Sequence, residues 1–355
     1  MSTSAGWRGT CGHVPRTHNP SFVGIRTLRN NNNPSVHGIR TLRNNKAIDS
    51  VGGKFYHAPV SGALLYFTLA VATLAVSWAA IIIRWADADP ISTAFYRMLF
   101  SSLILAIPAA PGLFKNLKKL PTGDYWRLLG SGVLLGLHFA TWITSLKYTT
   151  ISNSVILVAT QPFFVASVES FVFKEKISTR AIWGMLLAFA GMIVISRADF
   201  QIGGNRLFGD ILALIGAFCA GGYLMLGRKI RQTLDNRYYV FPVHVIATVT
   251  MLMIVGIFHS PLAGFSGRTW FCFFLLALIP TALGHNLYNY LLKFIRAHLV
   301  AVTILGEPLG ATVFAAIIFG EMPHIATYIG GGMILIGILI ALIRVKSEPI
   351  PFETA

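Results

Sequence analysis

The chain has 355 residues, of which 54% are hydrophobic and only 12% are charged, and its mean hydropathy is +0.65. This composition excludes a soluble globular protein and indicates a polytopic membrane protein. The net charge of +16 does not indicate nucleic-acid binding, because the basic residues lie in a polar N-terminal segment and in short loops between apolar segments. In those loops they act as topology signals.

Residues 1–60 differ in composition from the rest of the chain. They are polar and basic, and they carry a tandem duplication, NPSFVGIRTLRNN from Asn19 and NPSVHGIRTLRNN from Asn33. Such a segment cannot bury an apolar core, so we expect it to be disordered. Three interpretations stay open: an extension without function, an organelle transit peptide, or a cytoplasmic tail that binds anionic lipid or a partner.

Ten apolar segments follow, each of a length suited to a membrane-spanning helix. They cover residues 62–85, 91–114, 126–148, 151–173, 180–196, 208–226, 238–258, 270–292, 297–320 and 325–343. The predicted fold class is therefore an all-α integral membrane protein with ten transmembrane helices. The first five belong to a domain at 61–200 and the second five to a domain at 201–345, with a short tail at 346–355.

Lysine and arginine residues are concentrated in alternate loops. The loops after the second, fourth, sixth, eighth and tenth segments carry most of them. The positive-inside rule therefore places both termini in the cytoplasm. The predicted location of this multi-pass protein is the plasma membrane.

The two halves of the apolar region are related by an internal repeat. A shift of 146 residues places Gln161-Pro162 on Glu307-Pro308, and Lys147 on Lys293. The same shift places Gly184 on Gly330, Gly191 on Gly337, and Glu175 on Glu321. Five helices per half is an odd number, so the second half enters the membrane in the opposite orientation. Inverted repeats of this kind are typical of secondary transporters, whose sites lie where discontinuous helices meet near the midplane.

Glu307 and its counterpart Gln161 are the first candidate site residues. An ionisable side chain at membrane depth is costly and indicates a function, while Pro308 and Pro162 are expected to interrupt their helices and act as hinges. One interpretation makes Glu307 a protonatable group that couples solute to protons. The other makes it, like the Gln161 amide, a hydrogen-bond donor to the carbonyl that the proline leaves free.

Polar and aromatic residues share helix faces in two segments that the repeat superposes. His138, Trp142 and Ser145 lie on one face of the third segment. In the eighth segment His285 and Asn289 share a face, with Asn286 and Tyr290 beside it. Together these residues predict the lining of a pocket for a small amphipathic solute. For any single residue, a hydrogen bond between helices is the alternative.

Arg97 lies in the first turns of the second segment. It is either an anchor that snorkels to the membrane surface, or a partner for a solute carboxylate or for a loop acid, Asp87 or Asp89. Glu175 and Glu321 end their helices at the membrane surface, where we expect structural roles, including ion pairs with neighbouring basic residues that could act as gates. Glu169 is an acid inside the fourth segment and receives no predicted role.

As a set, these motifs resemble the drug/metabolite transporter superfamily, and in particular its ten-helix EamA-type members. The resemblance covers residues 62–345. It is carried by the motifs already described and by Trp78, Arg97, four helix glycines (Gly184, Gly191, Gly330, Gly337) and GDILALIGAF at the start of the second half. It implies ten helices, a central cavity between the halves, and alternating access. The motifs are not specific for a substrate, although relatives are described as exporters of amino acids and other metabolites.

The functional prediction is a secondary transporter that exports small metabolites and is not an enzyme. An importer or an organellar exchanger is the alternative within transport, and a membrane scaffold or regulator is the alternative outside it. The predicted partners are a small-molecule substrate and the lipid bilayer, with a homodimer left open and nucleic acid excluded. No cofactor and no metal are predicted, since the sequence lacks a Gly-rich phosphate loop and metal-ligand spacing.

Overall fold

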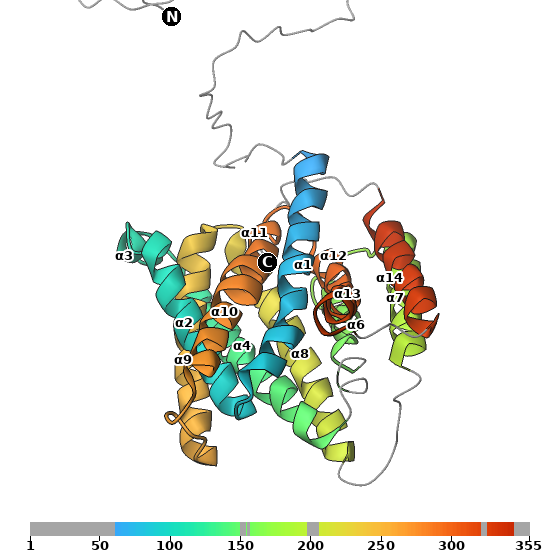
Figure 1. Cartoon of the computed structure of the whole chain (residues 1–355). Helices are drawn as coiled ribbons and strands as arrows, with labels where there is room; N and C mark the ends of the chain where they lie inside the picture. Colours follow the sequence, from blue (N-terminus) through green and yellow to red (C-terminus); the bar gives the residue numbers. More distant parts are fainter. Residues whose placement is uncertain (1–60, 150–153, 155–156, 197–205, 321–324, 344–355) are drawn as a thin grey trace, which may run out of the picture. The chain divides into compact units, whose positions relative to one another are not determined.

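The computed structural model describes residues 61–149, 154, 157–196, 206–320 and 325–343. The N-terminal segment, Glu321 and the C-terminal tail lie outside these residues, so the expectations about them stay predictions. The described part is helical throughout and contains no strand. Figure 1 shows its helices, which all belong to one compact unit of the chain.

The helices follow the order of the predicted segments. The first half contains α1 (Gly62–Ala86), α2 (Pro90–Ala109), α3 (Leu113–Leu117), α4 (Thr122–Tyr148), α6 (Gln161–Phe171) and α7 (Thr179–Ser196). The second half contains α8 (Arg206–Arg231), α9 (Asn236–Phe258), α10 (Gly267–Leu276), the π-helix η1 (Ala277–His285), α11 (Asn286–Leu291), α12 (Ala297–Ile304), α13 (Glu307–Phe319) and α14 (Ile325–Leu342).

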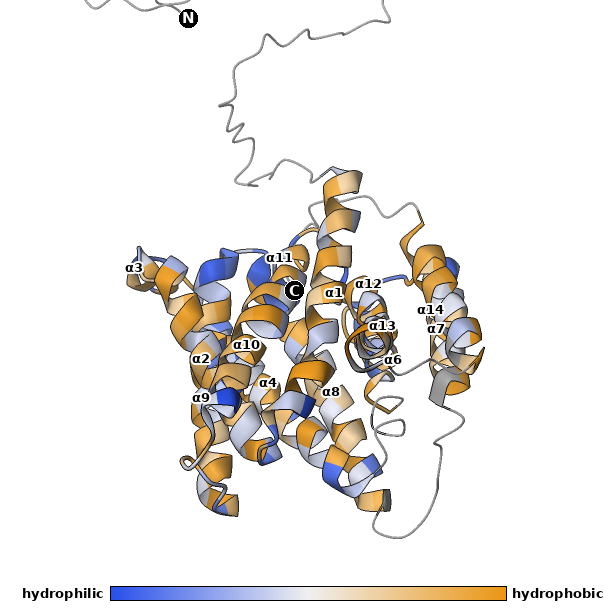
Figure 2. Cartoon of the chain, viewed as in Figure 1, coloured by the Kyte–Doolittle hydropathy of each residue, from blue (hydrophilic) through white to orange (hydrophobic). Residues whose placement is uncertain are grey.

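Seven helical stretches within the described residues are long and apolar enough to cross a membrane, counting α10 to α11 and α12 to α13 as one stretch each. Helices α7 and α14 are apolar but shorter, and α6 covers only part of the fourth predicted segment. The number of ten spans therefore stays a prediction. Apolar residues cover much of the helix surface (Figure 2), and large side chains such as Phe171, Ile107 and Ile317 are more than 70% exposed, as expected of surfaces that face lipid.

One boundary differs clearly from the sequence prediction. The second helix was expected to reach residue 114, but α2 ends at Ala109 and a short helix, α3, follows. Pro108 and Pro111 cannot donate backbone hydrogen bonds, and Gly112 has a φ of +85°, which turns the chain.

Helices α7 and α14 are counterparts in the repeat, and they pack directly against each other. A Cβ atom added to Gly184 would lie 2.5 Å from the carbonyl oxygen of Gly337, and one added to Gly191 would lie 2.5 Å from that of Gly330. Gly184 contacts Gly337, whereas Gly191, which comes later in α7, contacts Gly330, which comes earlier in α14. The two helices are therefore antiparallel. Counterpart helices that run in opposite directions are what an inverted repeat requires.

Contacts between other helices also follow the internal repeat. Helix α4 packs along α8, while its counterpart stretch, α10 and η1, packs along α1, which is the counterpart of α8. The counterpart pair α2 and α9 also contact each other, and α6 of the first half contacts α12 of the second. The space between the halves is therefore bounded by elements from both.

Candidate functional site

Two helices begin in the middle of the apolar region, at Gln161 and at Glu307. Helix α12 ends at Ile304 and α13 starts at Glu307, so the interruption predicted at Pro308 is present. Pro162 and Pro308 each occupy the first turn of their helix, where the missing N–H would have had no intrahelical partner. The prolines thus mark helix starts rather than bends within continuous helices.

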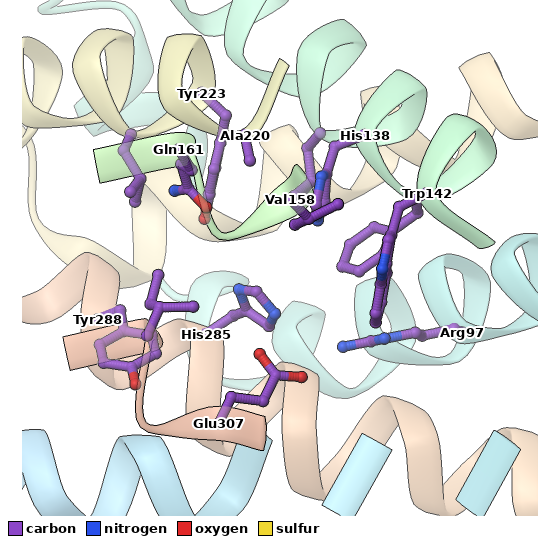
Figure 3. Close-up of a pocket in the computed structure, with 14 residues that line it drawn as sticks. Arg97, His138, Trp142, Val158, Gln161, Ala220, Tyr223, His285, Tyr288 and Glu307 are labelled. Carbon is purple, nitrogen blue, oxygen red and sulfur yellow. The ribbon is translucent and has the colours of Figure 1, made fainter. Parts of the chain in front are cut away.

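A cavity of about 50 Å³ lies where these helix starts meet α2, α4, α8 and η1. Six of the nine predicted substrate and coupling residues line it: Arg97, His138, Trp142, Gln161, His285 and Glu307 (Figure 3). The remaining lining residues are Leu135, Phe139, Val158, Ala220, Tyr223, Leu224, Tyr288 and Ile304. This volume holds a few water molecules, so a metabolite can enter only after the helices separate.

Arg97 does not snorkel to the membrane surface, because its side chain is only 1% exposed. Its Nε donates to the Thr281 hydroxyl at 2.8 Å, and its guanidinium carbon lies 4.3 Å from the centre of the Phe139 ring. Its Nη1 is buried and has no hydrogen-bond partner among the residues that the structure describes. Asp89, one of the predicted loop partners, pairs with Lys147 at 2.8 Å instead.

Glu307 faces Arg97 across the cavity (Figure 3). The two groups interact electrostatically, but no ion pair within 4.0 Å joins them in the described part of the chain. The polar end of Gln161, the counterpart of Glu307, lies on the same cavity. Each half therefore contributes one polar residue at a helix start, and Arg97 supplies a positive charge.

His138 and Trp142 share a helix face, as the spacing predicted. Their rings are nearly parallel, with an interplanar angle of 6° and centroids 5.9 Å apart. His138 Nδ1 lies 2.9 Å from the carbonyl oxygen of Gly216, which fixes the imidazole against α8. Ser145, the third residue on that face, hydrogen-bonds Ser154 at 2.6 Å and does not line the cavity.

Asn286, Asn289 and Tyr290 do not line the cavity. Asn289 donates to the Tyr223 hydroxyl and to the His285 carbonyl, and Asn286 accepts from Asn236 of α9. Tyr290 packs on Phe294 with centroids 5.1 Å apart. Asn286 and Asn289 therefore form hydrogen bonds between helices, which is the alternative role left open for each residue.

Tyr223 and Tyr288 line the cavity but were not predicted. The Tyr288 hydroxyl is 2.8 Å from the Thr73 hydroxyl of α1, which ties the second half to the first. In the sequence, each is simply a tyrosine within an apolar segment. Tyrosines that only pack against neighbouring helices look the same, so the sequence could not single these two out.

Comparison with known proteins decides the family. The EamA-like transporter family matches residues 61–197 and again residues 207–343, and both ends of the second match lie 146 residues after those of the first. The chain belongs to the EamA-like transporter family. The two matches have the same offset as the internal repeat, so the family's two-repeat architecture accounts for it.

The relatives of this EamA protein are named as transporters. An uncharacterized transporter of Archaeoglobus fulgidus is 29% identical over 71% of this chain and 87% of its own length. A protein of Fusobacterium nucleatum named riboflavin transporter ImpX is 24% identical over 64% of this chain and 80% of its own length. A solved crystal structure shares the fold, with a TM-score of 0.66 and 17% identity over 80% of this chain and 98% of its own.

Proposed function

We propose that this EamA protein is a secondary transporter that exports amino acids or related small metabolites across the plasma membrane, with both termini in the cytoplasm. The cavity between the halves is the substrate site, and alternating access opens it to each face in turn. The observation that carries this proposal is the buried Arg97 Nη1, which has no hydrogen-bond partner in the described part of the chain and belongs to a side chain that lines the cavity together with Glu307.

A buried unpaired guanidinium nitrogen is costly, and a carboxylate is its best-matched partner. A substrate carboxylate would satisfy it. Glu307, on the opposite wall, would receive a substrate ammonium group or a proton. The apolar and aromatic lining would hold an apolar side chain.

The alternative within transport is an importer or an organellar exchanger. The relative named as a riboflavin transporter favours a substrate with a flat ring system, and the rings of Trp142, His138 and Phe139 in this cavity suit such a solute. The alternative outside transport is a scaffold that acts through the basic N-terminal segment.

Efflux of labelled amino acids and toxic analogues from cells tests the proposal. The unmodified chain, Glu307→Gln and a deletion of residues 1–50 are compared with and without a protonophore, at matched expression. We expect efflux by the unmodified chain and by the deletion, and loss of efflux with Glu307→Gln and with the protonophore.

Efflux that is indifferent to both treatments would overturn proton coupling while leaving transport in place. Loss of function on deleting residues 1–50 would favour the scaffold. Uptake of riboflavin without amino-acid efflux would favour the importer.

A further inference from the structure

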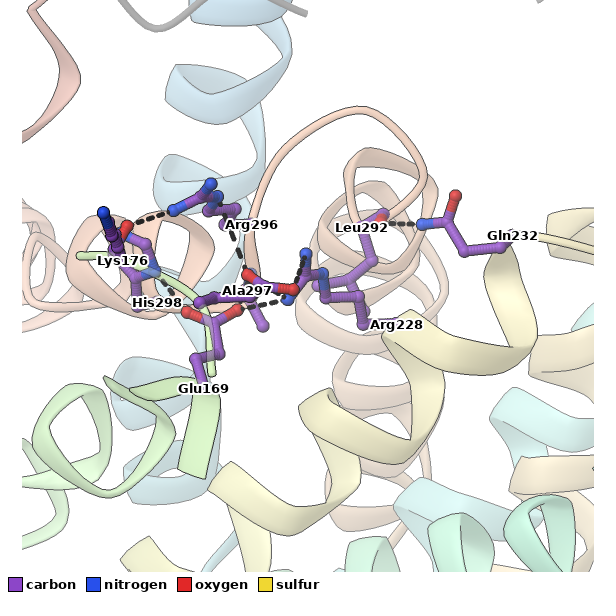
Figure 4. A network of polar contacts seen from close by, with 9 residues as sticks. Glu169, Lys176, Arg228, Gln232, Leu292, Arg296, Ala297 and His298 are labelled. Atoms are coloured by element: carbon purple, nitrogen blue, oxygen red, sulfur yellow. Dashed lines mark hydrogen bonds and ion pairs between the residues drawn. The ribbon is translucent and has the colours of Figure 1, made fainter. Parts of the chain in front are cut away.

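A buried cluster of charges lies away from the cavity, at one end of α6, α8 and α12. It consists of Glu169, Arg228, His298, Glu175 and Arg296 and is called the Glu169 cluster below (Figure 4). Glu169 is fully buried, and Arg228 and His298 are 6% and 2% exposed. Sequence analysis gave Glu169 no role, and the proposed substrate site does not use it.

Glu169 is the centre of this cluster. Its carboxylate accepts from Arg228 Nη1 at 2.8 Å and from the backbone N–H of Ala297 at 3.0 Å, and it contacts His298 Nδ1. Arg228 also pairs with Glu175 at 2.8 Å, which in turn lies 3.6 Å from Arg296. Glu169 and Glu175 belong to the first half of the chain, whereas the other three residues belong to the second. The cluster therefore joins the two halves.

The cluster and the cavity share two helices, α6 and α8. On α8, Ala220 and Leu224 line the cavity and Arg228 follows at the same four-residue spacing. On α6, Gln161 lines the cavity and Glu169 lies eight residues further on. Eight helical residues span about 12 Å. The cluster thus lies roughly two helical turns from the cavity, between the cavity and one membrane face.

The repeat provides no matching cluster on the opposite face. The positions that correspond to Glu169, Arg228 and His298 are Ala315, Ile82 and Ser152, which cannot form the same ion pairs. On that opposite face Lys147 pairs with Asp89, but both residues belong to the first half. Within the described residues, an ion-pair network that joins the two halves is therefore found on the Arg228 face.

We propose that the Glu169 cluster is a gate, which closes the cavity on the Arg228 face and must separate for solute to pass there. This rests on the alternating access of the proposed function. A buried ion-pair network gains Coulomb energy but pays for desolvation, so its net contribution is small when both partners are present. When the helices separate, water solvates the same charges. The paired and the separated states can thus differ little in free energy, as a gate requires.

A reversible lock tests the gate. Glu169 and His298 contact each other through the ends of their side chains. Glu169→Cys and His298→Cys, in a chain whose native cysteines are replaced, are therefore joined in membranes by a short, reducible thiol-to-thiol cross-linker that spans the removed atoms. The gate predicts that cross-linking stops transport and that reduction of the linker restores it. Each single cysteine variant, treated in the same way, is the control. Transport that continues in fully cross-linked protein would overturn the gate and leave the cluster as a structural tie.

A second measurement needs no substrate and therefore separates failure of the gate from failure of the proposed function. Ala220→Cys reports on the cavity through its rate of labelling by a membrane-impermeant thiol reagent applied to each face of sealed vesicles. Glu169→Gln should raise labelling from the Arg228 face by roughly tenfold. Lys147→Gln, which removes the ion pair on the opposite face, should not raise it. Equal labelling rates in a Glu169→Gln protein that is folded and monodisperse would contradict the gate.

Discussion

Gly184 of α7 packs against the backbone of Gly337 in α14, so closely that a methyl group at Gly184 would lie 2.5 Å from the Gly337 carbonyl oxygen. In the repeat, Gly184 corresponds to Gly330 and Gly337 to Gly191, and Gly191 and Gly330 form the matching contact. The four glycines therefore form two contacts related by the pseudo-twofold symmetry of the chain. Small residues let helix backbones approach closely in a membrane, where no hydrophobic effect drives helices together.

Gly184→Ala should destabilise the protein, because the added methyl group forces α7 and α14 apart. Overpacking of this kind costs about 1–3 kcal/mol. Gly332 of α14 is the matched control, since a Cβ there meets nothing within 4 Å, and Gly332→Ala should be neutral or slightly stabilising. Thermal unfolding of both variants in detergent measures the difference. Equal midpoints for the two would refute the close contact.

Thr281→Val should weaken transport more than folding. Thr281 accepts a hydrogen bond from Arg97 Nε at 2.8 Å and donates one to the carbonyl of Leu276, the last residue of α10. Without the hydroxyl, the guanidinium has one more unsatisfied donor, at a cost of about 1–3 kcal/mol, and its orientation in the cavity is lost. We expect a raised KM at unchanged expression. Thr248→Val, which removes only a bond within α9, is the control and should behave as the unmodified chain.

Acid should destabilise the end of the molecule that carries Asp89, before the start of α2. Burial alone would raise the pKa of Asp89, but hydrogen bonds from Lys147 and from the Ser92 backbone outweigh it and hold the pKa below its usual range. Because the pKa of Asp89 is lower in the folded state, the charged carboxylate stabilises the folded protein at pH values above the ordinary pKa of an aspartate. This stabilisation is lost as the pH falls through the lower folded-state value.

The measurement for Asp89 is the pH dependence of the unfolding temperature. Lys147→Gln removes the partner, so it should reduce the loss of stability below about pH 4, the ordinary aspartate range. Parallel pH profiles for the variant and the unmodified chain would show that the ion pair contributes nothing.

Local pattern was enough to predict much of the fold and part of the site. Apolar length located the helices, and the Gln161-Pro162 and Glu307-Pro308 pairs located the mid-span helix starts. The face shared by His138 and Trp142 was also predicted, because α4 is a regular helix over that stretch.

The other features of the site depend on contacts between residues that are far apart in the sequence, and a pattern within one segment does not reveal such contacts. The spacing placed His285 and Asn289 on one face, but the Asn289 amide bonds the Tyr223 hydroxyl of α8, a contact that spacing within one segment does not report. The contact between Glu169 and His298 joins residues 129 positions apart, and periodicity carries no information at that separation. The repeat offset could not reveal it either, since the counterpart positions hold different residues.

Solute flux into and out of liposomes that contain only the purified protein shows whether this protein itself transports amino acids through the cavity, because no other transporter is present. We expect flux of a labelled amino acid down its gradient without ATP, and a reduction of at least about tenfold in Arg97→Gln, equivalent to about 1.4 kcal/mol. Arg127→Gln, which removes only a pair with Asp124, should leave the flux unchanged. Flux that is equal in Arg97→Gln and the unmodified protein, or no greater than in empty liposomes for every amino acid tried, would contradict this expectation.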